Sequence, residues 1–185
     1  EIQEDGALLF ITGGSNQADG PKWVNQDGMW PAMAAMAEKN QAIVSILRQT
    51  PNQPLYNGKS EDELISFTLH KFRENGDYTW PLLFPMVKSA VRAMDAVQEF
   101  SEQYLDREVN GFVVSGASKR GWTTWLTAAI GDRRVKAIAP MVIDVLNMPV
   151  NLQYQLDSYG TYREKIQDYV DLGIVQSMAS PEGKA

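Results

Sequence analysis

The chain has 185 residues, of which 44% are apolar and 22% charged, so it can bury the core of a globular domain. Its 17 Lys and Arg residues against 23 Asp and Glu residues give a net charge of −6, which argues against nucleic acid or an anionic lipid surface as its main partner. The absence of Cys excludes a disulfide framework, a thiol nucleophile and a thiolate zinc site.

The first half of the chain is predicted to alternate between buried strands and helices. An apolar strand at 7–12 ends in a Gly-Gly turn, and a loop rich in Gly, Asn, Asp and Pro leads to a helix at 29–40 and a second strand at 41–47. Ser60, with Glu63 three residues later, has the pattern of a capping box and predicts a helix that continues to about residue 74.

The second half continues the alternation and then changes. A long helix at 82–104 precedes a third strand at 109–115, and a helix at 119–130 separates this strand from a fourth at 135–143. Apolar strands separated by helices are typical of a parallel sheet that is covered on both faces, so the predicted fold class is α/β. From residue 147 the sequence becomes polar and aromatic, which indicates a cap or lid. The expected domains are therefore a core at 1–147 and the start of a cap at 148–185.

The most informative segment is residues 113–122, VVSGASKRGW, in which a strand passes into a helix at Ser118. In a nucleophile elbow the serine hydroxyl projects from such a corner, and small neighbours let the strand and helix approach closely. The usual pattern is G-x-S-x-G, whereas here Arg120 takes the last position and Gly121 follows it. The segment therefore matches a G-x-S-x-x-G variant.

Two other interpretations of this segment stay open. A Ser that precedes a helix is often only its N-cap. Gly116 and Gly121 also have the spacing of a phosphate-binding loop, but that motif continues with Lys and then Ser or Thr, whereas this chain has Trp122 and Thr123. The dinucleotide fingerprint G-x-G-x-x-G is absent, and neither a cofactor nor a metal is predicted.

The turn after the first strand supports the nucleophile interpretation. A serine that transfers acyl groups needs hydrogen-bond donors directed at the developing oxyanion, one from the residue after the nucleophile and one from an earlier loop. The backbone of Lys119 is the first candidate, and the turn at Gly14 and Ser15 supplies the second. The order of these elements is that of an α/β-hydrolase from its third to its sixth strand.

A family resemblance rests on four segments, which are LLFITGGSN at 8–16, YTWPLLFPM at 78–86, GASKRGW at 116–122 and VIDVLN at 142–147. Together they resemble the PhoPQ-activated pathogenicity-related protein family, a branch of the α/β-hydrolases, over about residues 7–171. The resemblance implies a secreted or periplasmic protein, mainly bacterial, with virulence-linked naming. The family also resembles a secreted eukaryotic proliferation repressor, which implies signalling without catalysis as an alternative.

The partners of a catalytic triad are not all present. In α/β-hydrolases the acid and the His follow the Ser along the chain, and no His follows Ser118. The single His, His70, precedes it on a helix expected to pack outside the sheet, and we interpret it as a structural or surface residue. Asp144, at the end of the strand after Ser118, is the candidate acid, with a loop-capping or supporting carboxylate as the other interpretation. Arg120 and Lys119 are expected to make surface or lid contacts.

These observations predict a fragment of a secreted serine hydrolase that lacks its first and last strands and its catalytic His. The complete protein would form an acyl-enzyme on Ser118 from a small-molecule or peptide-like ester or amide. No nucleic-acid partner and no membrane span are expected, and the fragment alone is predicted to be inactive. The alternative is a noncatalytic protein with a hydrolase fold that acts through its surface.

Overall fold

The computed structural model describes residues 5–16 and 28–179, and the chain divides into two compact units that are described separately. The sheet unit comprises Glu1–Gln53 and Phe84–Ile143, and the helical unit comprises Pro54–Leu83 and Asp144–Ala185. Residues 54–83 thus group with the C-terminal helices, and the expected domain boundary at residues 147 and 148 stays a prediction. Most of the loop predicted after Asn16 lies outside the described residues.

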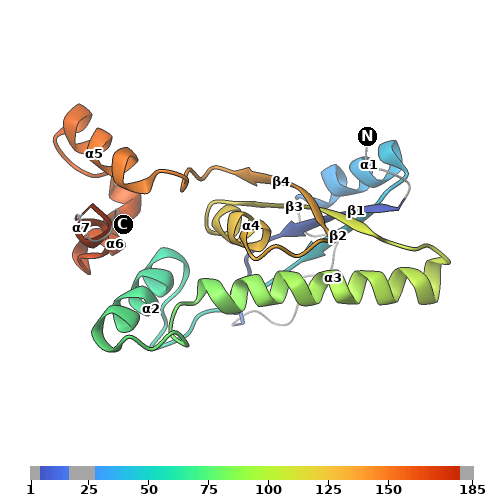
Figure 1. Cartoon of the computed structure of the whole chain (residues 1–185), viewed down its shortest axis with the longest axis horizontal. Helices are drawn as coiled ribbons and strands as arrows, with labels where there is room; N and C mark the ends of the chain where they lie inside the picture. Colours follow the sequence, from blue (N-terminus) through green and yellow to red (C-terminus); the bar gives the residue numbers. More distant parts are fainter. Residues whose placement is uncertain (1–4, 17–27, 180–185) are drawn as a thin grey trace. The chain divides into compact units, whose positions relative to one another are not determined.

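The sheet unit is built on four parallel strands in the order β2-β1-β3-β4 (Figure 1). Their bounds are β1 Gly6–Ile11, β2 Ile43–Leu47, β3 Gly111–Ala117 and β4 Val135–Met141. The four predicted strands are present, although the third lies two residues further along the chain and so runs directly up to Ser118. Parallel neighbours need crossover connections, which the helices supply. The α/β class is confirmed, and the architecture is consistent with an α/β-hydrolase-like fold.

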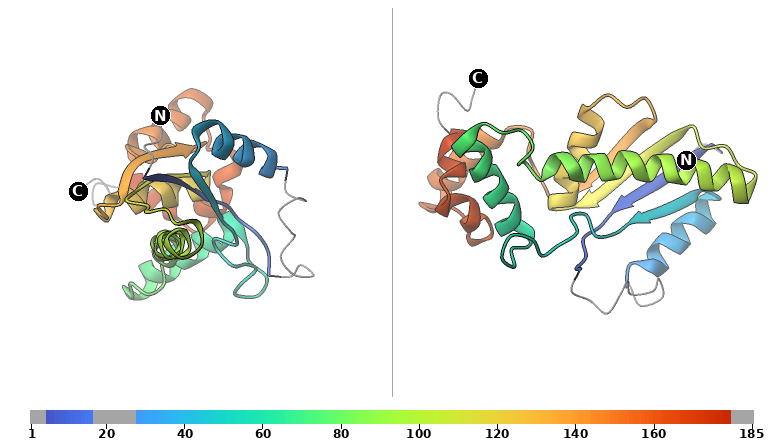
Figure 2. Two further views of the ribbon diagram at one scale, coloured as in Figure 1. Left: turned by 90° about the vertical axis from the view of Figure 1, so that its right-hand side faces the viewer. Right: turned by 90° about the horizontal axis from the view of Figure 1, so that it is seen from below.

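Helices cover both faces of this sheet because its central strands are apolar on both sides. Helix α3, Leu83–Leu105, runs along one face, and α1, Trp30–Asn40, lies on the other (Figure 2). Side chains alternate along β1, so Leu9 and Ile11 pack with Met94 of α3, whereas Leu8 and Phe10 pack with Met33 of α1. Helix α4, Lys119–Ala129, connects β3 to β4. Strand β1 is therefore buried along its whole length.

The helical unit contains α2 (Glu61–Asn75), α5 (Met148–Tyr159), the 3₁₀ turn η2 (Glu164–Ile166), α6 (Gln167–Asp171) and α7 (Ile174–Ala179). Two long-range hydrogen bonds tie α2 to the C-terminal helices. The buried Tyr169 hydroxyl donates to Asp62 Oδ1 at 3.0 Å, and Arg73 Nη1 donates to the Leu172 carbonyl at 3.2 Å. Burial and the neighbouring Asp62 carboxylate raise the pKa of Tyr169, so its hydroxyl remains a donor at neutral pH.

The start of α2 differs from the predicted capping box. Ser60 is the N-cap residue, but its side chain makes no capping hydrogen bond. Glu63 pairs instead with Lys59, whose Nζ lies 2.5 Å from Glu63 Oε1. The three acidic residues of the first turn also favour this helix end, because the partial positive charge of a helix N-terminus attracts carboxylates.

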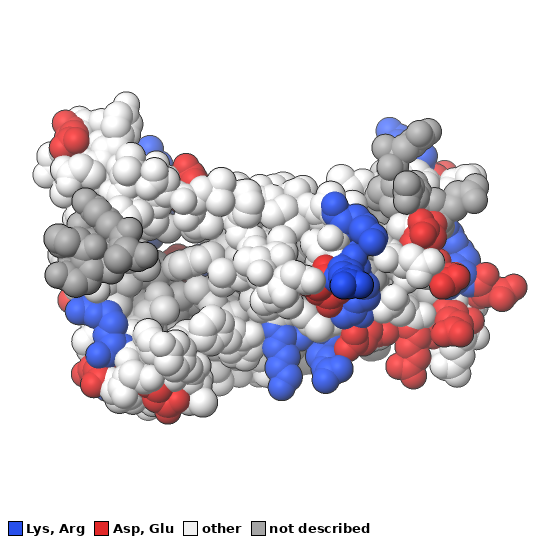
Figure 3. Space-filling view, in the orientation of Figure 1, with Lys and Arg blue, Asp and Glu red and all other residues white. Residues whose placement is uncertain are grey.

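Charged side chains do not form one basic face on the surface that Figure 3 shows. Acidic and basic side chains lie next to one another there over the sheet unit. No helix within the described ranges has both the length and the apolar character needed to cross a membrane.

Candidate functional site

Strand register brings the Gly13–Gly14 turn and Ser118 to the same edge of the sheet. Ile11 of β1 pairs with Gly116 of β3, so Gly13 and Ser118 each lie two residues past this pair on neighbouring parallel strands. On the other side of β3, Ser118 N–H donates to the Met141 carbonyl of β4 at 2.8 Å. The candidate residues Gly14, Ser15, Ser118 and Lys119 thus gather at the carboxyl end of the central strands, where open α/β sheets bind their ligands.

Ser118 occupies a strained backbone conformation between β3 and α4. Its φ is 55° and its ψ is −121°, a region that side chains other than glycine rarely adopt. Although Ser118 is at the N-cap position of α4, its side chain makes no capping hydrogen bond. An ordinary N-cap has extended backbone and an oxygen that accepts from the first helical turn, so capping does not explain this serine.

Close packing around the corner requires two of its glycines. A Cβ at Gly121 would lie 2.5 Å from Ile143 Cγ2 and 2.8 Å from the Met141 carbonyl oxygen. A Cβ at Gly116 would lie 2.8 Å from both Cβ and the carbonyl oxygen of Arg120. Neither glycine has a positive φ, so both are needed for space rather than for backbone freedom.

The Gly13–Gly14 turn is held by the segment that follows β2. Gln49 N–H donates to the Gly13 carbonyl at 3.0 Å, and Gln49 Nε2 donates to the Ser15 carbonyl at 3.1 Å. One residue further, Asn16 N–H donates to the Gln53 carbonyl. These bonds use carbonyl oxygens of the turn, while the Gly14 amide donates no hydrogen bond to any other described residue.

Arg120 is buried beneath this turn, and the expectation that it makes surface or lid contacts is wrong. The side chain is 7% exposed, and its Nε donates to the Thr50 carbonyl at 2.6 Å. A Cβ at Gly13 would lie 2.8 Å from Arg120 Cζ and closer still to Nη2, so the guanidinium packs directly against Gly13. Arg120 thus connects the first turn of α4 to the loops after β1 and β2.

Helix α4 buries a polar face that includes Arg120. The spacing of its threonines is a local sequence signal for this face, although it does not reveal the distant partners of Arg120. Thr123, Thr124 and Thr127 are fully buried, at three, four and seven residues from Arg120. Each hydroxyl donates to the carbonyl four residues earlier, which satisfies it within the helix. Since Thr123 is fully buried as well as bonded to the Lys119 carbonyl, its hydroxyl is not exposed to a ligand as the metal-binding hydroxyl of a phosphate-binding loop is.

The single His and the candidate acid both belong to the helical unit. His70 lies on α2, where its Nε2 is 3.3 Å from Glu74 Oε1. Hydrogen bonding to Lys71 first, and then the charges of Lys71 and His70, lower the pKa of Glu74, so this carboxylate is charged at neutral pH. Asp144 follows β4 as the first residue of the helical unit and is exposed. A catalytic role for Asp144 stays a prediction, as does the structural or surface interpretation of His70.

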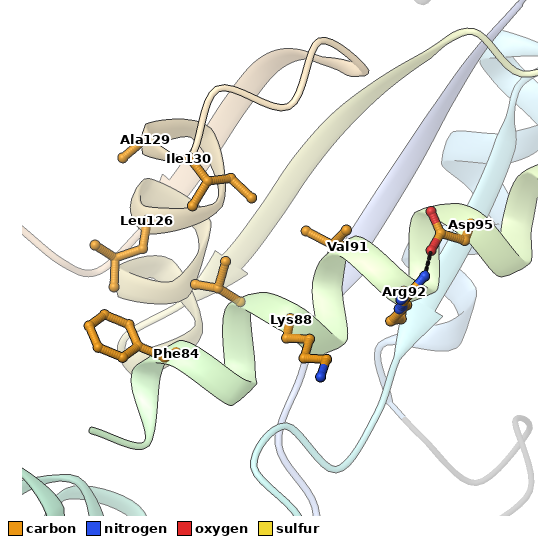
Figure 4. Close-up of a pocket in the computed structure, with 9 residues that line it drawn as sticks. Phe84, Lys88, Val91, Arg92, Asp95, Leu126, Ala129 and Ile130 are labelled. Atoms are coloured by element: carbon orange, nitrogen blue, oxygen red, sulfur yellow. Dashed lines mark hydrogen bonds and ion pairs between the residues drawn. The ribbon is translucent and has the colours of Figure 1, made fainter. Parts of the chain in front are cut away.

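A groove on the sheet unit contains none of these residues. It has a volume of about 610 Å³ and lies between the first turns of α3 and the last turns of α4 (Figure 4). Phe84 and Val91 line it from α3, and Leu126 and Ile130 line it from α4. Among the residues that the structure describes, no group of three or more His, Asp or Glu side chains could hold a metal ion.

The sheet and the strand–serine–helix corner define the class as an α/β protein with a hydrolase-like architecture. A family model described as the PhoPQ-activated pathogenicity-related protein matches residues 1–185. The chain therefore belongs to the PhoPQ-activated pathogenicity-related protein family, as the four sequence segments predict.

A curated relative supports this assignment. The chain is 34% identical over 181 residues to autocrine proliferation repressor protein A of Dictyostelium discoideum. This match covers 95% of the chain and 35% of the relative, so the chain spans about a third of that protein's length. No match was found among solved structures.

Proposed function

We propose that this chain is the nucleophile-bearing part of a secreted serine hydrolase that cleaves an ester or amide bond. The observation that carries the proposal is the backbone of Ser118, with φ 55° and ψ −121° directly between β3 and α4. A nucleophile elbow holds its serine in such a strained turn so that Oγ is exposed at the sheet edge. The missing capping bond supports this interpretation over an N-cap.

The neighbouring turn fits the second requirement of acyl transfer. The Gly14 amide is free of other acceptors among the described residues, and strand register puts its turn beside Ser118. We assign Gly14 and Lys119 as the backbone donors to the oxyanion, with Ser15 as the other candidate from the turn. Two donors at this edge would stabilise the negative charge that develops on the substrate oxygen.

The proposed reaction has two steps. Ser118 Oγ attacks the carbonyl carbon and its proton passes to a His; the tetrahedral intermediate then expels the alcohol or amine, which takes that proton. Water hydrolyses the acyl-enzyme and releases the acid. Because no His follows Ser118 in these 185 residues, we propose that further sequence of a longer protein supplies the base. Asp144 is the proposed acid.

The test uses an alkyl fluorophosphonate probe, which labels an activated serine covalently, on the complete protein. We expect labelling of the wild type and its loss in Ser118→Ala. Ser115→Ala is the matched control because Ser115 lies three residues before Ser118, on β3, but is buried, and its Oγ donates to the Ala139 carbonyl at 2.7 Å. Equal labelling of the wild type and Ser118→Ala would exclude Ser118 as the nucleophile.

A second function, signalling by a noncatalytic protein of the same fold, is favoured by the relative named as an autocrine proliferation repressor. An autocrine factor acts from outside the cell, which is also the support for proposing secretion. This alternative predicts that the complete protein has no His within reach of Ser118, and that Ser118→Ala retains the effect of the wild type on cell proliferation.

A further inference from the structure

We propose that Arg120 is a positioning residue for the oxyanion site, an inference that rests on the proposed hydrolase function. Arg120 follows Lys119 in the first turn of α4, and its guanidinium packs against Gly13, the residue before Gly14. The two proposed oxyanion donors are the amides of Lys119 and Gly14. Each is next in sequence to one side of the contact between Arg120 and Gly13.

The contacts explain how Arg120 fixes the distance between the two donors. Its Nε is bonded to the Thr50 carbonyl at 2.6 Å, while Thr50 N–H donates to the Thr12 carbonyl at 3.1 Å. This pair of bonds connects α4 to the residue after β1 through the backbone of the segment after β2. The guanidinium then limits how closely Gly13 approaches the helix.

Burial of a cation at this position is costly unless it is well bonded, which argues that the residue does more than fill space. Arg120 is 7% exposed and its Nε is bonded to the Thr50 carbonyl, whereas the side chain of Arg134, elsewhere in the sheet unit, is 23% exposed. A lysine keeps the charge but has neither the Nε donor nor the guanidinium that packs against Gly13. Arg120→Lys therefore removes the contacts that hold the turn while it keeps the positive charge at this position.

The experiment measures the rate constant for fluorophosphonate labelling, and kcat and KM for a p-nitrophenyl ester, on the complete protein. In Arg120→Lys we expect labelling and kcat to fall by about 10- to 100-fold with KM changed by less than about threefold, because misplaced donors weaken only transition-state binding. Arg134→Lys is the control, since it alters a bonded guanidinium at the start of β4, and it should label at the wild-type rate.

A second variant, Gly13→Ala, keeps the Arg120 side chain and displaces the Gly13–Gly14 turn. Gly13→Ala places a methyl group against the guanidinium, and we expect it to slow labelling similarly. In the Arg120→Met background the same substitution should have a smaller effect, because its clash partner is gone. If Arg120→Lys folds and its labelling rate is within twofold of the wild-type rate, the positioning role is wrong. If Arg120→Lys does not fold, the same criterion applies to Gly13→Ala. That result is distinct from labelling of Ser118→Ala, which would overturn the proposed function itself.

Discussion

Gly121 determines how closely helix α4 approaches strand β4. Its missing side chain leaves room for the Met141 carbonyl and the Ile143 side chain, and the former also accepts the Ser118 N–H. The space at this glycine therefore maintains the bond that fixes the strained serine. Gly121 has no catalytic group, but its small size controls the backbone geometry of Ser118, the proposed nucleophile.

Gly121→Ala should destabilise the protein by about 2 kcal/mol, because the added Cβ meets backbone that cannot move cheaply. Urea unfolding followed by circular dichroism measures the change. Gly28→Ala is the matched control: a Cβ at Gly28 meets no atom of the described residues within 4 Å, so its effect should stay within about 0.5 kcal/mol. Equal unfolding midpoints for Gly121→Ala and wild type would contradict the close approach.

Single residues at the site were predictable to different degrees. Ser118 and the turn at Gly13 follow from the sequence because strand, glycine and helix signals are local. Arg120 does not, because its burial depends on Thr50 and Gly13, which are distant in sequence. The small size needed at Gly116 and Gly121 also follows from the sequence, because a nucleophile elbow requires the strand and helix to approach closely.

An ion cluster joins the long helix to the entry of the last strand. Arg134, just before β4, contacts Asp95 Oδ1 of α3 at 2.6 Å and Asp132 Oδ2 at 2.7 Å, and also donates to Gln98 Oε1 at 2.8 Å. Hydrogen bonds from Arg134 are the main reason that the pKa of Asp132 and that of Asp95 lie below their usual range. The cluster therefore favours the charged form of both carboxylates.

Asp132→Asn should remove part of this stabilisation, by about 1–2 kcal/mol at pH 7, since the cluster is partly exposed. A carboxyl group with a lowered folded-state pKa contributes stability above its unfolded value, near pH 3.9, and loses it as the pH falls through the folded value. The wild type should thus lose stability below about pH 4 more steeply than the variant does. Urea midpoints between pH 3 and 7 measure this difference.

The control for this comparison is Glu38→Gln on α1, an exposed carboxylate without an ion pair among the described residues. Its acid dependence should match that of the wild type. If Asp132→Asn has the wild-type slope as well, the bonds from Arg134 do not stabilise the folded state.

Elements were more predictable than their caps and connections. All four strands and the helices between them follow from hydrophobic patterning, since burial against a sheet requires that periodicity. The end of β3 was misplaced by two residues because Gly116 and Ala117 resemble a turn, yet ladder bonds to β1 and β4 keep them in the strand. The capping box at Ser60 failed since Lys59 competes for Glu63. The end of β3 depends on its neighbouring strands and the start of α2 on the Lys59–Glu63 pair, and sequence patterning reveals neither contact.

The whole chain contains the nucleophile candidate and its oxyanion turn but a single His. We therefore expect the 185 residues alone to hydrolyse p-nitrophenyl acetate no faster than buffer does, because no His follows Ser118 in them to accept its proton. A turnover that disappears in Ser118→Ala would contradict this expectation. Testing His70→Gln would then show whether His70 supplies the base.

The most direct test of the account locates the probe on the protein. After reaction of the complete protein with a fluorophosphonate, trypsin should release residues 108–119, EVNGFVVSGASK, which contain both Ser115 and Ser118. Fragmentation of this peptide in a mass spectrometer separates the two serines. We predict the added mass on Ser118. An adduct on Ser115, on another peptide or nowhere would contradict the assignment of Ser118 as the nucleophile.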